Sequence, residues 1–205
     1  MLCGSLVVCA TGQEEGLIKL PAPQTTGGKP LMQALQERQT QRSFAPQPLP
    51  QQVLSNLLWA ACGVNRPESG KRTAPTARNM QEIDVYVALA EGLYLYDAKT
   101  HSLQLVVKAD LRAATGRQDF VAIAPVNLIF VADFARMGKG SDEEKKFYSA
   151  TDAGFISQNV YLFCASEGLA TVVRGMVDRE KLGPAMQLRP EQRIILAQTV
   201  GYPGK

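Results

Sequence analysis

Residues 36–44 read Q-E-R-Q-T-Q-R-S-F and place two arginines, Arg38 and Arg42, four positions apart with Thr40 between them. A guanidinium presents several donors in a planar fork that suits a phosphate group, and a hydroxyl between two such forks adds another donor. Two interpretations are open. The stretch is either an anion-binding segment, with Gln39 as a further polar contact, or the solvated end of a helix, where the helix dipole favours basic side chains.

Predicted helices lie on both sides of this stretch. Residues 30–37 carry apolar side chains at the spacing of one helix face, and Pro30 suits a first helical position. Residues 51–62 show a similar spacing and predict a core-facing helix that ends at Gly63. Between the two helices, three prolines in residues 45–50 exclude regular structure.

A second polar stretch, residues 73–81, reads T-A-P-T-A-R-N-M-Q and leads into a predicted strand over residues 83–89. The chain from residue 63 to residue 76 is rich in turn formers and predicts a surface loop, the kind of segment in which binding residues are common. Taken alone, this stretch is also what a simple loop before a strand looks like.

Together, R-Q-T-Q-R-S-F and P-T-A-R-N-M-Q resemble the R-x-S-x-[RK]-x-F and P-S-x-x-N-x-Q segments of the nitroreductase family of FMN-dependent oxidoreductases. The run from Asp152 to Leu162 is similar to the family's long central helix, D-x-G-x-x-x-Q-N-x-Y-L. The resemblance covers residues 31–205. It implies an α+β fold of three layers, α-β-α, with a mixed central sheet and a long interface helix, in a domain-intertwined homodimer that binds FMN.

The resemblance also implies which residues contact FMN. In this family the second stretch reaches across the dimer interface to the partner's flavin, a role that falls on Pro75, Thr76, Ala77 and Asn79. The family's usual Ser-Ser is Thr76-Ala77 here, so one hydroxyl contact is lost. Many relatives place one or two further basic residues near the C-terminus to bind the FMN phosphate, and here Lys205 alone is available.

Three further residues are implied at the flavin ring. Arg174 and Gly175 match a family position whose backbone N–H groups face the N5 and O4 edge of the flavin, where Gly permits a close approach. Gln118 lies near the position at which the family places an amide side chain against the ring. The phosphate end would be bound by the first stretch, through Arg38, Gln39, Thr40 and Arg42.

The rest of the chain predicts a meander of three strands, followed by further strands and helices. Strands are expected over residues 83–89, 92–96, 103–107, 126–132, 171–173 and 193–200, and helices over residues 110–115, 147–168 and 178–188. Residues 137–146 predict a surface loop. Cys62 and Cys164 lie in apolar helical runs and are expected to be buried, and His101 is expected in a solvated loop. The cysteine spacing and the single histidine argue against a zinc site or a Cys-His nucleophile.

The N-terminus has a different composition. Residues 1–10 read M-L-C-G-S-L-V-V-C-A, an apolar run with a small-residue end that is typical of a secretory signal, although the basic n-region is missing. The alternative is a hydrophobic strand. Residues 11–29 predict a polar tail, so the folded domain is expected over residues 30–205. A genuine signal would place the protein in the periplasm or outside the cell, and its absence would leave a cytoplasmic protein.

Composition and charge narrow the function. The chain of 205 residues is 45% hydrophobic and 20% charged, and it has no apolar run long enough to span a membrane. A net charge of +3 does not favour nucleic-acid binding.

No catalytic side chain is expected, because FMN would carry the chemistry. The resemblance implies ping-pong hydride transfer from NAD(P)H to a nitroaromatic or quinone. The phrase G-L-Y-L-Y-D also resembles azoline-dehydrogenase-type members of the family, so oxidation of a peptide-derived ring is one alternative function. A second alternative is a protein that binds flavin without turnover.

Overall fold

A computed structural model describes residues 16–205 of the chain. A seven-stranded sheet lies at its centre, and every described pair of neighbouring strands is antiparallel. This differs from the mixed sheet that the resemblance implies, because three strands form a meander and each strand beyond it reverses direction beside its neighbour. In spatial order the strands are β1 (Leu17–Lys19), β6 (Ser102–Val107), β5 (Gly92–Asp97), β4 (Ile83–Leu89), β7 (Val126–Asp133), β9 (Gln192–Gly201) and β8 (Ala170–Arg174).

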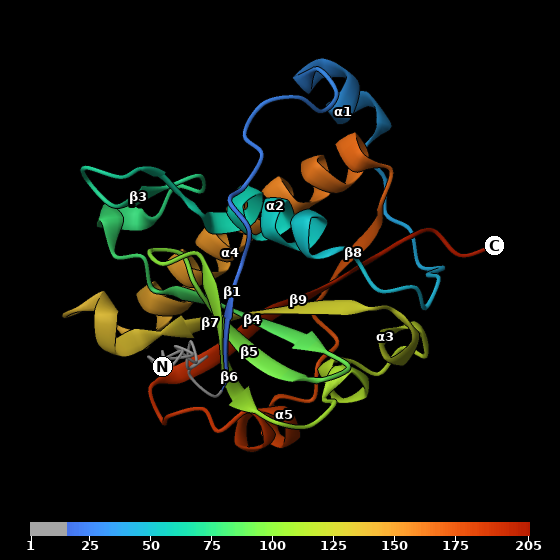
Figure 1. Cartoon of the computed structure of the whole chain (residues 1–205). Helices are drawn as coiled ribbons and strands as arrows, with labels where there is room; N and C mark the ends of the chain where they lie inside the picture. Colours follow the sequence, from blue (N-terminus) through green and yellow to red (C-terminus); the bar gives the residue numbers. More distant parts are fainter. Residues whose placement is uncertain (1–15) are drawn as a thin grey trace, which may run out of the picture.

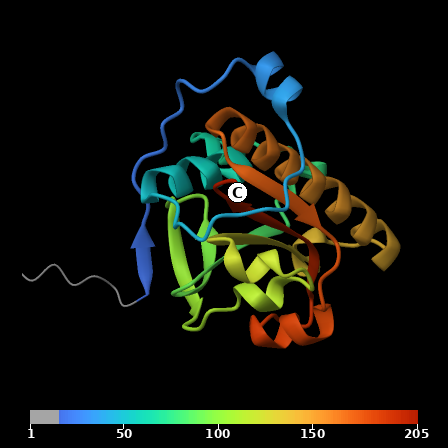
Figure 2. The ribbon, with the colours of Figure 1, turned by 90° about the vertical axis from the view of Figure 1, so that its right-hand side faces the viewer.

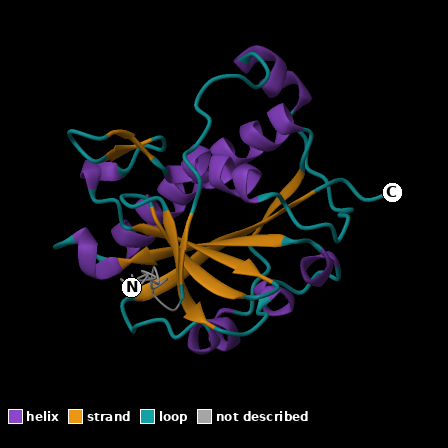
Figure 3. Ribbon diagram, viewed as in Figure 1, coloured by secondary structure: helices purple, strands orange, loops and turns teal. Residues whose placement is uncertain are grey.

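Helices cover both faces of the sheet (Figures 1 and 3), which gives the three-layer α+β architecture expected from the sequence. α2 (Gln51–Cys62) and α4 (Asp142–Glu167) pack on one face, and α5 (Arg179–Ala185) packs on the other. α1 (Leu31–Glu37) lies against the C-terminal half of α4 (Figure 2). The smaller elements are the hairpin β2 (Val64–Arg66) and β3 (Lys71–Arg72), the helix α3 (Phe120–Ile123), and the 3-10 turns η1 (Ala77–Asn79), η2 (Arg112–Thr115) and η3 (Phe134–Met137).

Alternating side chains of the central strands build a core on each face of the sheet. Val85 of β4 and Phe130 of β7 are paired in register and pack toward α2 and α4. Their neighbours Tyr86 and Ile129 are paired in the same way and pack toward α5. Every residue of β7 is buried, as a strand covered on both faces must be.

The sheet begins before residue 30, the expected start of the folded domain. β1 pairs with β6 at the edge of the sheet, and the chain then passes α2 on its way to α1 (Figure 1). Part of the tail expected over residues 11–29 therefore belongs to the sheet. The signal-like run of residues 1–10 lies outside the described residues. Within residues 16–205, no helix is long and apolar enough to cross a membrane.

The long helix begins earlier than its apolar pattern. A surface loop is expected over residues 137–146, yet α4 starts at Asp142. The Ser141 hydroxyl caps it by accepting a hydrogen bond from the Glu144 N–H over 3.1 Å, and acidic residues of the first turn favour the positive end of the helix dipole. These polar residues carry no apolar periodicity, so hydrophobic spacing gave no sign of the first helical turn.

His101 is not the solvated loop residue expected from the sequence. Its Nε2 is 2.7 Å from the hydroxyl of Ser55 on α2, and its Nδ1 is 2.9 Å from the hydroxyl of Tyr96 on β5. Ser55 donates its proton to the carbonyl of Pro21 over 2.6 Å. The Ser55 hydroxyl can therefore accept a hydrogen bond from Nε2. Burial lowers the pKa of His101, which favours the neutral ring, and a neutral ring that donates from Nε2 accepts from the Tyr96 hydroxyl at Nδ1.

Candidate cofactor site

The first polar stretch is held against α4 by one tyrosine. Arg38 follows the last residue of α1, and its guanidinium lies over the Tyr161 ring, 5.3 Å from the centroid. The Thr40 hydroxyl is 3.0 Å from the Tyr161 hydroxyl, which also accepts a hydrogen bond from the Val173 N–H of β8 over 3.1 Å. Tyr161 thus connects the stretch both to the helix and to the edge of the sheet.

A hollow of about 400 Å³ opens beside this contact. Lys29, which also lines the hollow, pairs with Glu37. Arg38 is half-buried and has no carboxylate partner within residues 16–205. Arg42 and Gln39 are exposed. An unneutralised guanidinium at a polar hollow fits an anionic group. The polar side chains that line the hollow are Lys29, Gln36, Glu37, Arg38, Gln39, Gln41 and Thr171.

The C-terminus lies beside the same stretch. The Gly204 N–H donates to the Ser43 carbonyl over 2.9 Å, and the Ser43 hydroxyl donates to the Lys205 carbonyl over 3.4 Å. One residue earlier, Phe44 and Pro203 form an isolated antiparallel bridge. The structure therefore brings Lys205 next to the first polar stretch, although more than 160 residues separate them in the sequence.

β8 leads from this cluster to the residues expected at the flavin ring. Thr171 accepts a backbone hydrogen bond from Gln41 at one end of the strand, and Gly175 follows the strand at the other. Four residues of extended chain cover about 13 Å. Gly175 is exposed, and a Cβ built on it would meet nothing closer than Leu196 at 4.0 Å. The backbone there is open to a ligand.

The Arg174 side chain points into the protein. It is 4% exposed and donates to the Thr115 carbonyl over 2.8 Å, to Thr199 Oγ1 over 3.1 Å and to Asn127 Oδ1 over 3.0 Å. Burial without a carboxylate partner lowers the pKa of Arg174 to about 10. Because its side chain is enclosed by these partners, Arg174 presents only its backbone toward the site.

Gln118 adjoins Arg174 at a crowded position. A Cβ built on Gly116 would lie 1.9 Å from Arg174 Nη1 and 2.8 Å from Gln118 Oε1, so this close approach requires glycine. Gln118 Oε1 is buried and has no hydrogen-bond partner within residues 16–205. A buried acceptor without a donor is unfavourable, so a ligand donor at this position would satisfy it.

The second polar stretch lies elsewhere in the chain. The Ala77 N–H donates to Asp152 Oδ2 over 2.8 Å, and the Thr76 hydroxyl donates to Glu82 Oε2 over 3.0 Å. Asp152 precedes Tyr161 by nine residues, which is about 14 Å along a helix. The two stretches therefore contact different parts of α4.

This second stretch has an unusual backbone. Arg78, Asn79 and Gln81 all have positive φ angles, between 50° and 55°. Such angles are uncommon outside glycine and persist only where surrounding contacts fix them. Pro75 and Asn79 are exposed, and the Asn79 amide oxygen accepts a hydrogen bond from the Gln81 side chain over 3.2 Å.

Sequence reasoning missed Tyr161 and Lys29 as residues of the site. Tyr161 stands in the long-helix motif, where an aromatic residue at helical spacing resembles ordinary core packing. Lys29 lies in the segment expected as a polar tail. Among residues 16–205, no group of histidine, cysteine and acidic side chains is placed to bind a metal ion. Cys62 and Cys164 are buried as expected, and burial raises the pKa of the Cys62 thiol to about 11.

The residues present fit a flavin phosphate cofactor. An unneutralised guanidinium lies at one end of β8, and an open glycine backbone with an unpartnered buried amide lies near the other. The Arg38 guanidinium suits the phosphate group of such a cofactor, and the Gly175 backbone with the Gln118 amide suits the polar edge of its flavin ring.

Comparison with known proteins identifies the family. A family model described as the nitroreductase family matches residues 35–202. A Methanocaldococcus jannaschii protein named as a nitroreductase is 34% identical over 155 residues, which are 71% of this chain and 78% of that protein.

Solved structures agree. A Ralstonia eutropha JMP134 protein named as a nitroreductase is 47% identical, with a TM-score of 0.89 over 100% of this chain and 97% of that one. A Desulfovibrio desulfuricans protein, also named as a nitroreductase and crystallised with FMN, is 20% identical, with a TM-score of 0.63 over 87% of this chain and 89% of that one, and shows the fold. On the extent of the family match and the level of identity to its relatives, this chain belongs to the nitroreductase family.

Proposed function

We propose that this member of the nitroreductase family is an FMN-dependent oxidoreductase that works as a homodimer and reduces a small electrophilic acceptor, such as a nitroaromatic or a quinone, with NAD(P)H. The observation that carries the proposal is Arg38, a half-buried guanidinium without a carboxylate partner within residues 16–205, at a polar hollow of about 400 Å³. The cofactor found in the Desulfovibrio desulfuricans structure supports FMN as the anion.

The first polar stretch and the C-terminus would bind the phosphate end. Arg38 is oriented by the Tyr161 ring, and Thr40 is fixed by the Tyr161 hydroxyl, so both donors are positioned before a ligand arrives. Arg42 and Lys205 are exposed beside them and add positive charge. Gln39 lines the same hollow.

The ring end would lie along β8. The backbone at Gly175 can approach the ring without interference from the chain, and the amide of Gln118 can accept a hydrogen bond from it. When bound, FMN supplies ping-pong hydride transfer, from NAD(P)H to the acceptor. The chain contributes position and electrostatics, because backbone donors stabilise negative charge where it develops.

A homodimer explains why the two polar stretches lie apart. Residues 75–79 contact α4 about 14 Å along the helix from the chain's own Tyr161, and they would complete the site of the partner subunit. Apolar side chains are exposed on the two adjacent helices that a partner would cover. Met32 on α1 is 75% exposed, and Phe147 on α4 is 66% exposed. Exposed apolar groups on packed helices are typical of an interface.

An absorption spectrum of the purified protein, followed by anaerobic addition of NADH and then NADPH, tests this function. The expected result is a flavin spectrum that bleaches with a nicotinamide and recovers when a quinone is added. A flavin spectrum that no nicotinamide bleaches would contradict the donor and favour oxidation of a peptide-derived ring. A colourless protein that FMN cannot reconstitute would refute the cofactor. Sedimentation of the same sample as a monomer would refute the dimer.

A further inference from the structure

Glu82 and Asp152 form a pair of buried carboxyl groups beneath the second polar stretch. Glu82 directly precedes β4, Asp152 lies in α4, and their exposed fractions are 0% and 3%. Neither carboxyl has an ion-pair partner within residues 16–205. Burying two charged carboxylates side by side without a counter-ion is very unfavourable, and such a pair holds a proton instead.

Hydrogen bonds join both carboxyls to the loop of residues 75–81. The Thr76 hydroxyl donates to Glu82 Oε2 and accepts from the Gln81 N–H over 3.1 Å. The Ala77 N–H donates to Asp152 Oδ2. The residues with positive φ angles follow these two contacts, and such residues need outside support to keep their conformation. The pair therefore holds the start of the strained turn directly, and it holds Gln81 at the end of the turn through the Thr76 hydroxyl.

The remaining oxygen of Glu82 shows where the proton belongs. Oε1 is buried and has no donor within residues 16–205, so as part of a carboxylate it would be an unsatisfied acceptor. As an O–H group it becomes a donor, and the adjacent Asp152 carboxylate is an acceptor for it. Burial raises the pKa of the Glu82 carboxyl, and the negative charge of Asp152 raises it further.

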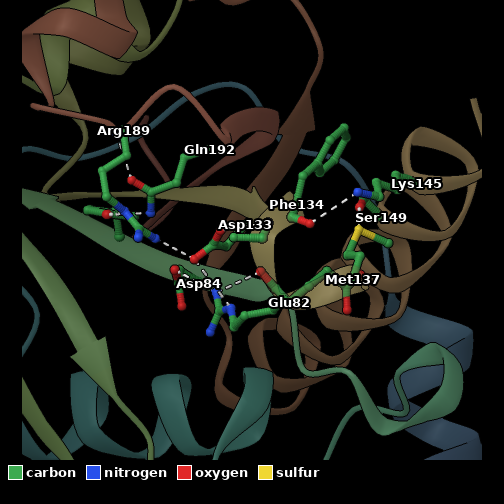
Figure 4. Close-up of polar contacts among 12 residues, drawn as sticks. Glu82, Asp84, Asp133, Phe134, Met137, Lys145, Ser149, Arg189 and Gln192 are labelled. Atoms are coloured by element: carbon green, nitrogen blue, oxygen red, sulfur yellow. Dashed lines mark hydrogen bonds and ion pairs between the residues drawn. The ribbon is translucent and has the colours of Figure 1, made fainter. Parts of the chain in front are cut away.

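The other charged groups nearby are bound elsewhere or make no hydrogen bond to the pair. Arg136 donates to the main-chain carbonyl of Glu82 over 2.8 Å and pairs with Asp84 over 2.7 Å. Figure 4 shows Glu82 and Asp84 close together, with Asp133 beside them. Arg72 lines the same cavity of about 20 Å³ as Asp152, and its Nε has no partner within residues 16–205. The Cys62 thiol lines that cavity as well and is neutral.

We propose that Glu82 keeps a proton at neutral pH and donates it to Asp152, and that this acid pair holds residues 75–81 in the conformation that meets the flavin of the partner subunit. The second half of the inference rests on the proposed function. Glu82 is then a positioning residue, because it acts on the cofactor through the loop.

Infrared spectroscopy tests the proton without any cofactor. The apo-protein at pH 7 should show the carbonyl stretch of a protonated carboxylic acid, and Glu82→Gln should remove it. The matched control Glu68→Gln, at an exposed position of the hairpin loop, should leave the band in place. A wild-type spectrum without the band, or a band that survives Glu82→Gln, would overturn the shared proton whether or not the protein binds FMN.

FMN titration tests the loop. Glu82→Gln keeps an acceptor for Thr76 and a donor for Asp152, so its FMN affinity should match the wild type. Glu82→Ala removes both and should weaken FMN about tenfold, the effect of one or two hydrogen bonds. Thr76→Val should give a similar loss if Glu82→Ala fails to fold. Wild-type affinity in Glu82→Ala or Thr76→Val would overturn the positioning role while leaving FMN binding intact. A wild-type protein that binds no FMN would refute the proposed function and with it this role of the loop, and the infrared test would still decide the proton.

Discussion

His101 should make the stability of this protein depend on pH below the ordinary histidine pKa of 6.5. In the folded state burial depresses its pKa below the ordinary value of 6.5, so the unfolded chain binds more protons in this range. The contribution of His101 to stability is complete above pH 6.5. It is lost as the pH falls from 6.5 through the folded pKa, because a charged ring would present two donors where Tyr96 now donates to Nδ1.

The size of the effect follows from the two hydrogen bonds of the ring. Each net hydrogen bond contributes about 1 kcal/mol, so His101→Asn should lower the free energy of unfolding by about 2 kcal/mol at pH 7.5. Asparagine is the suitable replacement because His101 has a φ of 50°, which asparagine tolerates. As the pH falls below 6.5 the difference between the two proteins should shrink, since the wild type loses the stabilisation that the variant lacks already.

Urea denaturation followed by Trp59 fluorescence measures this difference. Trp59 is the single tryptophan and lies on α2, one turn after Ser55. Other titratable groups are the same in the wild type and in His101→Asn, so their effects cancel in the difference between the two free energies of unfolding. His101→Asn and wild type with equal free energies of unfolding, or with a difference that is constant from pH 5 to pH 8, would refute the neutral hydrogen-bonded ring.

Further predictions concern the cofactor site and the core. Arg38→Ala should weaken FMN binding about ten- to a hundredfold, because it removes a contact of about 1.5 to 3 kcal/mol. Fluorescence titration measures this change, and the control Lys108→Ala, at an exposed position, should bind FMN as the wild type does. Unchanged affinity in Arg38→Ala would exclude Arg38 from the site. Deletion of Lys205 should also weaken FMN in the same titration, and an unaltered Kd would remove the C-terminus from the phosphate end. Gly116→Ala should destabilise the fold by about 1 to 3 kcal/mol because its Cβ overlaps Arg174, whereas Gly183→Ala, which meets nothing within 4 Å, should not be destabilising in thermal unfolding. Leu58→Ala at a fully buried position should cost about 2 to 5 kcal/mol in urea denaturation, and a smaller loss would mean that the cavity collapses.

Much of the fold could be predicted because its elements carry strong local patterns. α2 and β4 match their predicted bounds, since apolar spacing defines one and β-branched residues define the other. The start of α4 and strand β1 escaped prediction for a shared reason. The first turn of α4 is polar and depends on a cap, and β1 is three residues long and depends on its pairing with β6.

The site was predictable only where a motif carried it. Arg38 lines the hollow, and Thr40 and Lys205 lie beside it, while their role in binding the FMN phosphate stays a prediction. Arg174 shows the limit of this reasoning, because sequence does not say which way a strand-end side chain points, and here it is enclosed by Thr115 and Asn127. The Glu82–Asp152 pair could not be predicted from the sequence because the two residues are 70 positions apart and meet only in the folded chain.

The shortness of β1 has a consequence for solubility in concentrated solution. An exposed edge strand presents unpaired backbone groups that a second molecule can extend into a continuous intermolecular sheet. Within residues 16–205, β1 is paired along three residues, so it offers a short ladder for strand addition. Lys19, at the end of β1, adds a charge that would have to be buried in any such stack. The same three residues that complete the sheet thereby act against aggregation along this edge.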